Sequence, residues 1–292
     1  MRTRHTSLVL CLSASLLAFG QGVSKDTGLF VRRYQEGDKL TYHMKGNDDG
    51  VGYEIQASGV VKRDAQGHYY EEYAWSNLVR ESVPVPLPPA SVQFRQVLSF
   101  DPELTPSLPN LAQVPVLIGP ITDLLTFYSD FWLTMREGKL QKVGDRFSFQ
   151  PNMTASWADG SNVILGQSTI DFEMTLNAID DASQTATLLV RHVPPKVSPL
   201  KLPAAWMVEP VADTQNNWVS IRKGGDKYIA AIGKETFDVQ MKINLVDGLI
   251  LSGTLDNVVQ TRERECTDAA AGNCGEARSR QIKRQIEIVL ER

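Results

Sequence analysis

The chain has 292 residues, of which 42% are hydrophobic and 22% are charged. That is enough apolar material for one large domain or two small ones with a hydrophobic core, and too much for a disordered chain. Its 30 Lys and Arg face 34 Asp and Glu, and the resulting net charge of −4 excludes the strongly basic surface typical of nucleic-acid-binding proteins.

The first twenty residues have the pattern of a secretory signal peptide. Arg2 and Arg4 precede a short apolar stretch, 8–19, and small residues follow it. About a dozen apolar residues are too few to span a hydrocarbon core ~30 Å thick, which argues against a membrane anchor. We therefore expect residues 1–20 to be removed, leaving an exported protein, periplasmic or extracellular, with no transmembrane segment.

From residue 28 onward the dominant hydrophobic period is two, which is the period of β-strands with one wet face. Turn signals such as 47–50 and 64–67 recur about every ten residues, and this spacing favours an antiparallel meander over a parallel sheet. The segments expected to be strands are 40–45, 53–59, 69–75, 92–100, 146–149, 170–176, 185–192, 228–232, 237–245 and 249–255.

One helix is expected among these strands, over 120–136. Pro120 suits a first helical position, and apolar residues then recur at steps of three and four. A stripe this wide and aromatic is typical of a helix packed on a sheet, and it would also suit the lining of a lipid-sized cavity. The stripe consists of Ile121, Leu124, Leu125, Tyr128, Phe131, Trp132 and Met135.

The helix divides the strands into two groups. The chain is therefore either one β-rich domain, 28–292, or two half-sheets over about 28–110 and 139–292 with the helix between them. Residues 37–42 (GDKLTY) and 144–149 (GDRFSF) resemble each other, and each copy precedes a polar turn and an alternating strand. A duplication of the sheet would explain this similarity.

The end of the chain predicts two hairpins. Asp247-Gly248, after the strand 237–245, is the preferred pair for a two-residue type I′ turn. The last segment, 278–291, fits either a helix or a strand, and we favour a strand that pairs back onto residues 254–265. Its inward face would hold Ile282, Ile286, Ile288 and Leu290, with Arg284 as the one exception.

Two cysteines remain after signal cleavage, Cys266 and Cys274. An even pair in an exported chain predicts a disulfide, and the short polar segment between them suits a hairpin loop. This disulfide would staple a charged hairpin over 254–291.

Familiar catalytic and cofactor motifs are absent from the sequence. It contains no G-x-S-x-G, H-E-x-x-H, C-x-x-C or phosphate-binding glycine loop. Only three histidines follow the signal peptide, and none lies near the cysteine pair. We therefore expect no metal, no cofactor and no catalytic residues of a known type.

The signal peptide, the long alternating strands joined through Val246-Asp247-Gly248 and the helix over 120–136 resemble exported bacterial β-rich carriers of the lipoprotein-localisation type. In that family a curved antiparallel sheet is lined by apolar residues and closed by a helix. The resemblance implies a mainly β fold: a curved antiparallel sheet or half-barrel with one amphipathic aromatic helix packed on it. It concerns architecture only, and no functional residue is transferred from the family.

These features predict a non-enzymatic envelope protein that binds an apolar ligand or a lipidated partner in the helix-covered half-barrel. One alternative is a structural or protein-interaction module that uses the hairpin 254–291 to contact another envelope protein, and another is a hydrolase with an unfamiliar site. The residues expected to contact the ligand are Leu124, Tyr128, Phe131 and Trp132 on the helix, with Phe172, Met174, Tyr73 and Trp75 on the strands.

Overall fold

A computed structural model describes residues 28–101, 104, 111–149, 163–169, 171–194 and 200–291. The predicted signal peptide, 1–20, lies outside these residues and stays a prediction. The strands are β1 (Lys39–Asp48), β2 (Val51–Arg63), β3 (Tyr69–Arg80), β4 (Val83–Pro84), β5 (Gln96–Leu98), β6 (Arg146–Phe149), β7 (Val163–Ser168), β8 (Asp171–Asp180), β9 (Thr185–Val193), β10 (Trp218–Gly224), β11 (Lys227–Asn244), β12 (Ile250–Cys266) and β13 (Arg278–Glu291).

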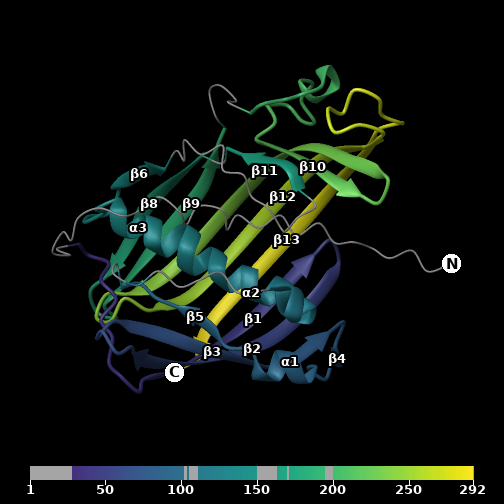
Figure 1. Ribbon diagram of the computed structural model, residues 1–292. Helices are drawn as coiled ribbons and strands as arrows, with labels where there is room; N and C mark the ends of the chain where they lie inside the picture. Colours follow the sequence, from purple (N-terminus) through teal and green to yellow (C-terminus); the bar gives the residue numbers. More distant parts are fainter. Residues whose placement is uncertain are drawn as a thin grey trace.

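All of these strands belong to one antiparallel sheet, which curves around a central helix (Figure 1). The order along the sheet is β4-β3-β2-β1-β13-β12-β11-β9-β8-β6, while β5 pairs with β3, β10 with β11 and β7 with β10. The path ends at β4 and at β6, so the sheet is open. The mainly β fold with a curved antiparallel sheet is therefore confirmed, and the two groups of strands expected on either side of the helix join in a single sheet.

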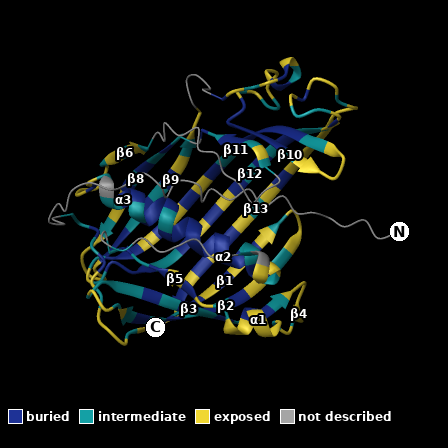
Figure 2. Cartoon of the chain, viewed as in Figure 1, coloured by how far each residue is buried: buried dark blue, intermediate teal, exposed yellow. Residues whose placement is uncertain are grey.

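Alternating side chains give this sheet a buried face and a wet face. In β11, Phe237, Val239 and Met241 are buried, whereas Asp238 and Gln240 between them are exposed. The buried positions of eight neighbouring strands, β3 to β8 in the order of the sheet, form one apolar cluster with the helix, and Figure 2 shows them as dark stripes on the strands. The helix thus packs on the concave, apolar face of the sheet.

The helix runs without a break through α2 (Ile118–Leu125), a π-helical segment η3 (Thr126–Trp132) and α3 (Leu133–Glu137). Inside it the Leu133 amide donates to the Tyr128 carbonyl five residues earlier, as π geometry requires. The prediction of a helix over 120–136 is confirmed within two residues at each end. We refer to 118–137 as the cover helix.

Two local expectations are wrong. Residues 92–100 are not one strand, because the chain forms α1 (Pro89–Gln93) before the short β5; Pro89 at the first turn favours this helix. The turn at Asp247-Gly248 is not a two-residue type I′ turn, since only Gly248 has a positive φ. The Asn244 amide instead donates to the Leu249 carbonyl across a four-residue loop (2.9 Å).

Short 3-10 helices complete the fold: η1 (Leu111–Gln113), η2 (Pro115–Leu117) and η4 (Ala205–Met207). The similar segments 37–42 and 144–149 also share a local geometry. Gly37 and Gly144 both have φ near +90°. The Gly37 amide donates to a carbonyl of β2, which pairs with β1, and the Gly144 amide donates to a carbonyl of β8, which pairs with β6. The resemblance between the two segments is therefore a structural one as well.

The C-terminal hairpin of β12 and β13 and its disulfide between Cys266 and Cys274 are confirmed. The hairpin is not a free ribbon, because the half of it that lies away from the disulfide forms the centre of the sheet between β11 and β1. Its tip packs on residues 200–217, where the Trp206 Nε1–H donates to the Ala271 carbonyl (2.9 Å) and Cys266 is buried.

Gly248 lies where the turn between β11 and β12 meets the N-terminal segment. Its φ is +74°, and a Cβ there would lie 2.4 Å from the Val31 carbonyl oxygen. We expect Gly248→Ala to lower the free energy of unfolding by ~1–2 kcal/mol for the left-handed backbone and by a further ~1–3 kcal/mol for the clash. Urea denaturation measures the loss.

Gly50→Ala is the matched control for this prediction. Gly50 also has a positive φ, +88°, but a Cβ there meets nothing within 4 Å. Only the backbone cost should appear, and an equal loss in both variants would contradict the argument from the close approach of Val31.

Candidate functional site

All eight residues predicted to contact an apolar ligand are buried, with exposed fractions of 0–5%. They come from the cover helix, from β3 and from β8, and they belong to one apolar cluster. Neither of the two cavities described below is lined by any of them. The structure therefore brings these residues together and packs them against one another.

The cover helix joins the two sides of the curved sheet through aromatic contacts. On one side the Tyr128 and Tyr73 hydroxyls are 2.7 Å apart. On the other, the rings of Phe131 and Phe172 meet edge to face with centroids 6.0 Å apart. Trp132 lies against Phe100, with ring centroids 3.8 Å apart.

A buried ion pair lies beneath the tyrosine side of the helix. The Arg32 guanidinium contacts the Glu71 carboxylate at 2.8 and 2.9 Å, and both side chains are almost fully buried. The hydroxyls of Tyr73 (2.8 Å) and Tyr128 (3.0 Å) donate to the other carboxylate oxygen. Glu71 thus connects the N-terminal segment, β3 and the cover helix.

A second ion pair holds the N-terminal half of the helix. The Arg284 guanidinium on β13 donates to the Asp123 carboxylate on the helix, and the Tyr53 hydroxyl on β2 donates to its second oxygen (2.5 Å). Burial and Asp123 together raise the pKa of Tyr53 well above its usual value, so the phenol stays protonated. The neighbouring carboxylate raises the pKa of Arg284 despite its burial, so the guanidinium stays charged.

Two further carboxyl groups lie close to Arg284 in the same interface. Glu235 on β11 accepts a hydrogen bond from the Asn257 amide on β12 (2.9 Å). Asp130 on the helix is buried, and its Oδ2 has no hydrogen-bond partner among the described residues. Burial raises the pKa of Asp130 from 3.8 to about 7 and that of Glu235 from 4.5 to about 7. Arg284 opposes both shifts without cancelling them.

A cavity of about 290 Å³ lies beside this interface, at the N-terminal end of the cover helix. It is lined by the tip of the hairpin of β1 and β2, by the start of α2 and by residues of β12 and β13. Asp123 and Arg284 form its polar part, and Ile118, Val259 and Ile282 belong to its apolar part. This cavity connects solvent with the boundary between helix and sheet.

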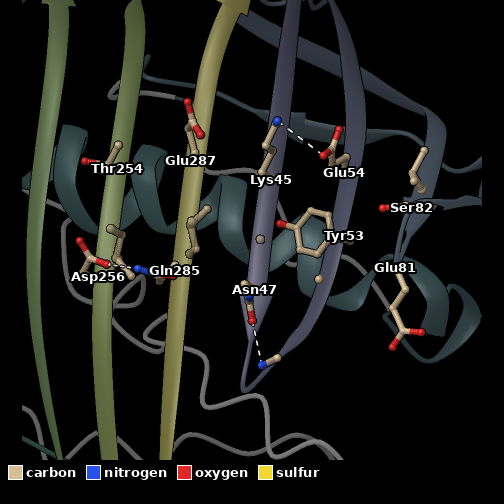
Figure 3. Close-up of a pocket in the computed structure, with 16 residues that line it drawn as sticks. Lys45, Asn47, Tyr53, Glu54, Glu81, Ser82, Thr254, Asp256, Gln285 and Glu287 are labelled. Carbon is tan, nitrogen blue, oxygen red and sulfur yellow. Dashed lines mark hydrogen bonds and ion pairs between the residues drawn. The ribbon is translucent and has the colours of Figure 1, made fainter.

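A larger hollow of about 580 Å³ lies over β1, β2, β12 and β13 and is shown in Figure 3. Most of its labelled side chains are polar, and several pair with one another: Lys45 with Glu54 (3.5 Å) and the Gln285 amide with Asp256 (2.7 Å). Paired charges spread along strands do not converge on one point, so this surface offers no evident catalytic arrangement.

Among the residues that the structure describes, no cluster of three or more His, Cys, Asp or Glu side chains is placed to hold a metal ion. None of the helices described is both long and apolar enough to cross a bilayer.

Sequence reasoning missed the buried charges, although a signal for some of them was present. Arg284 interrupts the apolar face of 278–291, and it is the residue that binds the helix. Glu71 and Glu235 likewise stand at inward positions of alternating strands, two residues before Tyr73 and Phe237. A charged residue on the apolar face of an expected strand was therefore the sequence signal that could have identified these buried charges.

Comparison with protein-family models, curated proteins and solved structures returned no match.

Proposed function

We propose that the protein binds a ligand with an apolar chain on the concave face of its sheet, and that the cover helix occupies this place when no ligand is bound. The observation that carries the proposal is an open sheet whose concave face is apolar and is covered by one aromatic helix. A ligand would exchange its own apolar surface for that of the helix on the sheet, so the concave face of the sheet stays out of water in either state.

The connections of the helix support such an exchange. The cover helix is bounded by residues 99–117 and 138–145, and no strand lies in the described part of either segment. The helix can therefore lift without breaking the hydrogen bonds of the sheet. The cavity beside Ile118 gives a ligand access to the boundary where lifting would begin.

The experiment is purification without detergent, mass spectrometry of bound lipids and titration with a fluorescent fatty acid. We expect a co-purifying apolar molecule or saturable probe binding. Phe127 is fully buried and packs over Gly253, where a Cβ would lie 2.4 Å from its ring. Phe127→Leu should weaken the covered state and raise the apparent affinity for the probe by about 5- to 10-fold.

The matched control is Val289→Ala on the wet face of β13, where the side chain is 40% exposed; it should leave the affinity unchanged. Absence of bound lipid together with no saturable probe binding, in the wild type and in Phe127→Leu alike, would refute the proposal.

One observation favours partner binding through the C-terminal hairpin as a second candidate. Residues 278–283 of β13 pair with β12 on one side, whereas β1 begins to pair at Arg284. The Lys283 carbonyl already accepts from the Asp49 amide (2.9 Å), so on the described chain 278–282 is a short basic edge that carries Arg278 and Arg280. An acidic extended segment of another envelope protein is the partner whose charge and shape fit it.

Cross-linking from this edge tests the second candidate. A photo-reactive residue at Ser279 should capture an acidic partner, and the charge reversals Arg278→Glu and Arg280→Glu should abolish the capture. Capture that is unaffected by these reversals would exclude the edge as the contact.

A further inference from the structure

We propose that Asp130 and Glu235 form a pH-dependent latch: while both are uncharged the cover helix lies on the sheet, and their ionisation at higher pH releases it. This inference adds regulation to the proposed ligand site and rests on that function for its biological meaning.

Among the described residues of this interface, one cation serves three carboxyl groups. Arg284 is the guanidinium that faces them, and it already binds Asp123. Asp130 approaches from the helix and Glu235 from β11; both interact with the charge of Arg284, and Glu235 also raises the pKa of Asp130. A buried carboxylate without its own cation is strongly destabilised, so two of the three groups are stable there only when protonated.

Three other titratable groups around the latch, Arg284, Tyr53 and His192, keep one charge state between pH 5 and pH 8. Arg284 stays charged and Tyr53 on β2 stays neutral. Burial near Lys234 lowers the pKa of His192 on β9, whose ring lies against Phe237, from 6.5 to about 4, so it is neutral too. Asn257 on β12 does not titrate. Asp48, at the adjacent cavity, also has a raised pKa but lies nearer to solvent.

The direction of the effect follows from proton linkage. On the sheet, the pKa values of Asp130 and Glu235 are about 7, and in a lifted helix they return toward 3.8 and 4.5. The covered state therefore binds more protons, and its advantage is complete below about pH 4 and lost as the pH rises through 7. Between pH 5 and pH 8 one such carboxyl changes the ratio of lifted to covered helix by on the order of 100-fold.

Hydrogen exchange of the ligand-free protein tests the latch. Amides of the cover helix should lose protection by on the order of 100-fold or more from pH 5 to pH 8, after correction for the intrinsic pH dependence of exchange. Amides of β8 and β9 should keep theirs. In the double variant Asp130→Asn, Glu235→Gln the helix should show no pH-dependent loss. The control Asp238→Asn, on the exposed face of β11, should behave as the wild type.

Each other outcome overturns the latch. Protection of the helix that is independent of pH in the wild type shows that the carboxyls do not control it. An equal slope in the double variant assigns the effect to other groups, and an equal loss in β8 and β9 shows unfolding of the whole domain.

The same samples separate the latch from the proposed function. Exchange responds to the latch without any ligand, whereas the fatty-acid probe reports binding. If both proposals hold, the apparent affinity of the wild type for the probe rises from pH 5 to pH 8, and that of the double variant does not. A pH-dependent helix that binds no probe at either pH would leave the latch standing and exclude the ligand.

Discussion

Glu71→Gln is expected to lower the free energy of unfolding by about 3–5 kcal/mol, because it removes the charge that neutralises a buried guanidinium. The substitution keeps the size of the side chain, so packing is nearly unchanged. Arg32 would keep its carbonyl acceptors at Arg33 (2.7 Å) and Asp247 (3.2 Å) but would lose the carboxylate with which it pairs in the core. Urea denaturation at neutral pH measures the difference.

Glu72→Gln is the matched control, one residue further along β3 on the opposite face. Glu72 pairs with Lys62 at 2.5 Å, but the Lys62 side chain is 44% exposed. Partly exposed ion pairs of this kind contribute roughly 0–1 kcal/mol. Similar losses in the two variants would mean that the Arg32–Glu71 pair contributes no more than a surface pair.

Trp132→Ala is the second substitution with a large expected effect, a loss of about 3–5 kcal/mol. Trp132 is 1% exposed, stacks near Phe100 and donates its Nε1–H to the Gly248 carbonyl (2.9 Å). Truncation leaves a cavity at the C-terminal end of η3 and an unpaired carbonyl in the turn between β11 and β12.

Trp206→Ala provides the comparison, since Trp206 also donates to a backbone carbonyl at 2.9 Å but is only half-buried. Its Arg264 partner lies over the ring at 4.9 Å, near the surface. We expect a loss of about 1–2 kcal/mol, from one hydrogen bond and partial burial. If Trp132→Ala cost no more than this, the packing of the helix on the sheet would be much looser than its contacts indicate.

Strict alternation made most of the sheet predictable. A segment such as 237–245 has one arrangement that buries all of its apolar side chains on one face, and it lies in β11 with a short extension into the following turn. The strands β4, β7 and β10 were not expected from the sequence, and β10 was missed for the converse reason. Its four residues Trp218–Ile221 are all buried, so both faces are covered and no alternation exists to be recognised.

The candidate site was predictable only in its apolar part. The stripe of the helix follows from spacing, and all eight expected contact residues lie in the core. These residues fill the space between the helix and the sheet themselves because the helix lies close to the sheet. The hydrophobic periodicity of the sequence does not contain the distance between the two elements. The pairing of Asp123 with Arg284 joins residues far apart in the chain, so no local pattern indicates it.

The pairing of β1 with β13 has a consequence for folding. Thr41 to Asp48 take Glu291 to Arg284 as neighbours, so the middle of the sheet joins the two ends of the described chain. Contacts of such sequence separation form slowly, because most of the loop entropy is lost before they are made. A growing polypeptide can therefore form its early hairpins, but the sheet on which residues 118–137 pack is incomplete until the last strand, β13, has been synthesised. A nascent chain that stops before residue 284 should stay a target for chaperones and proteases.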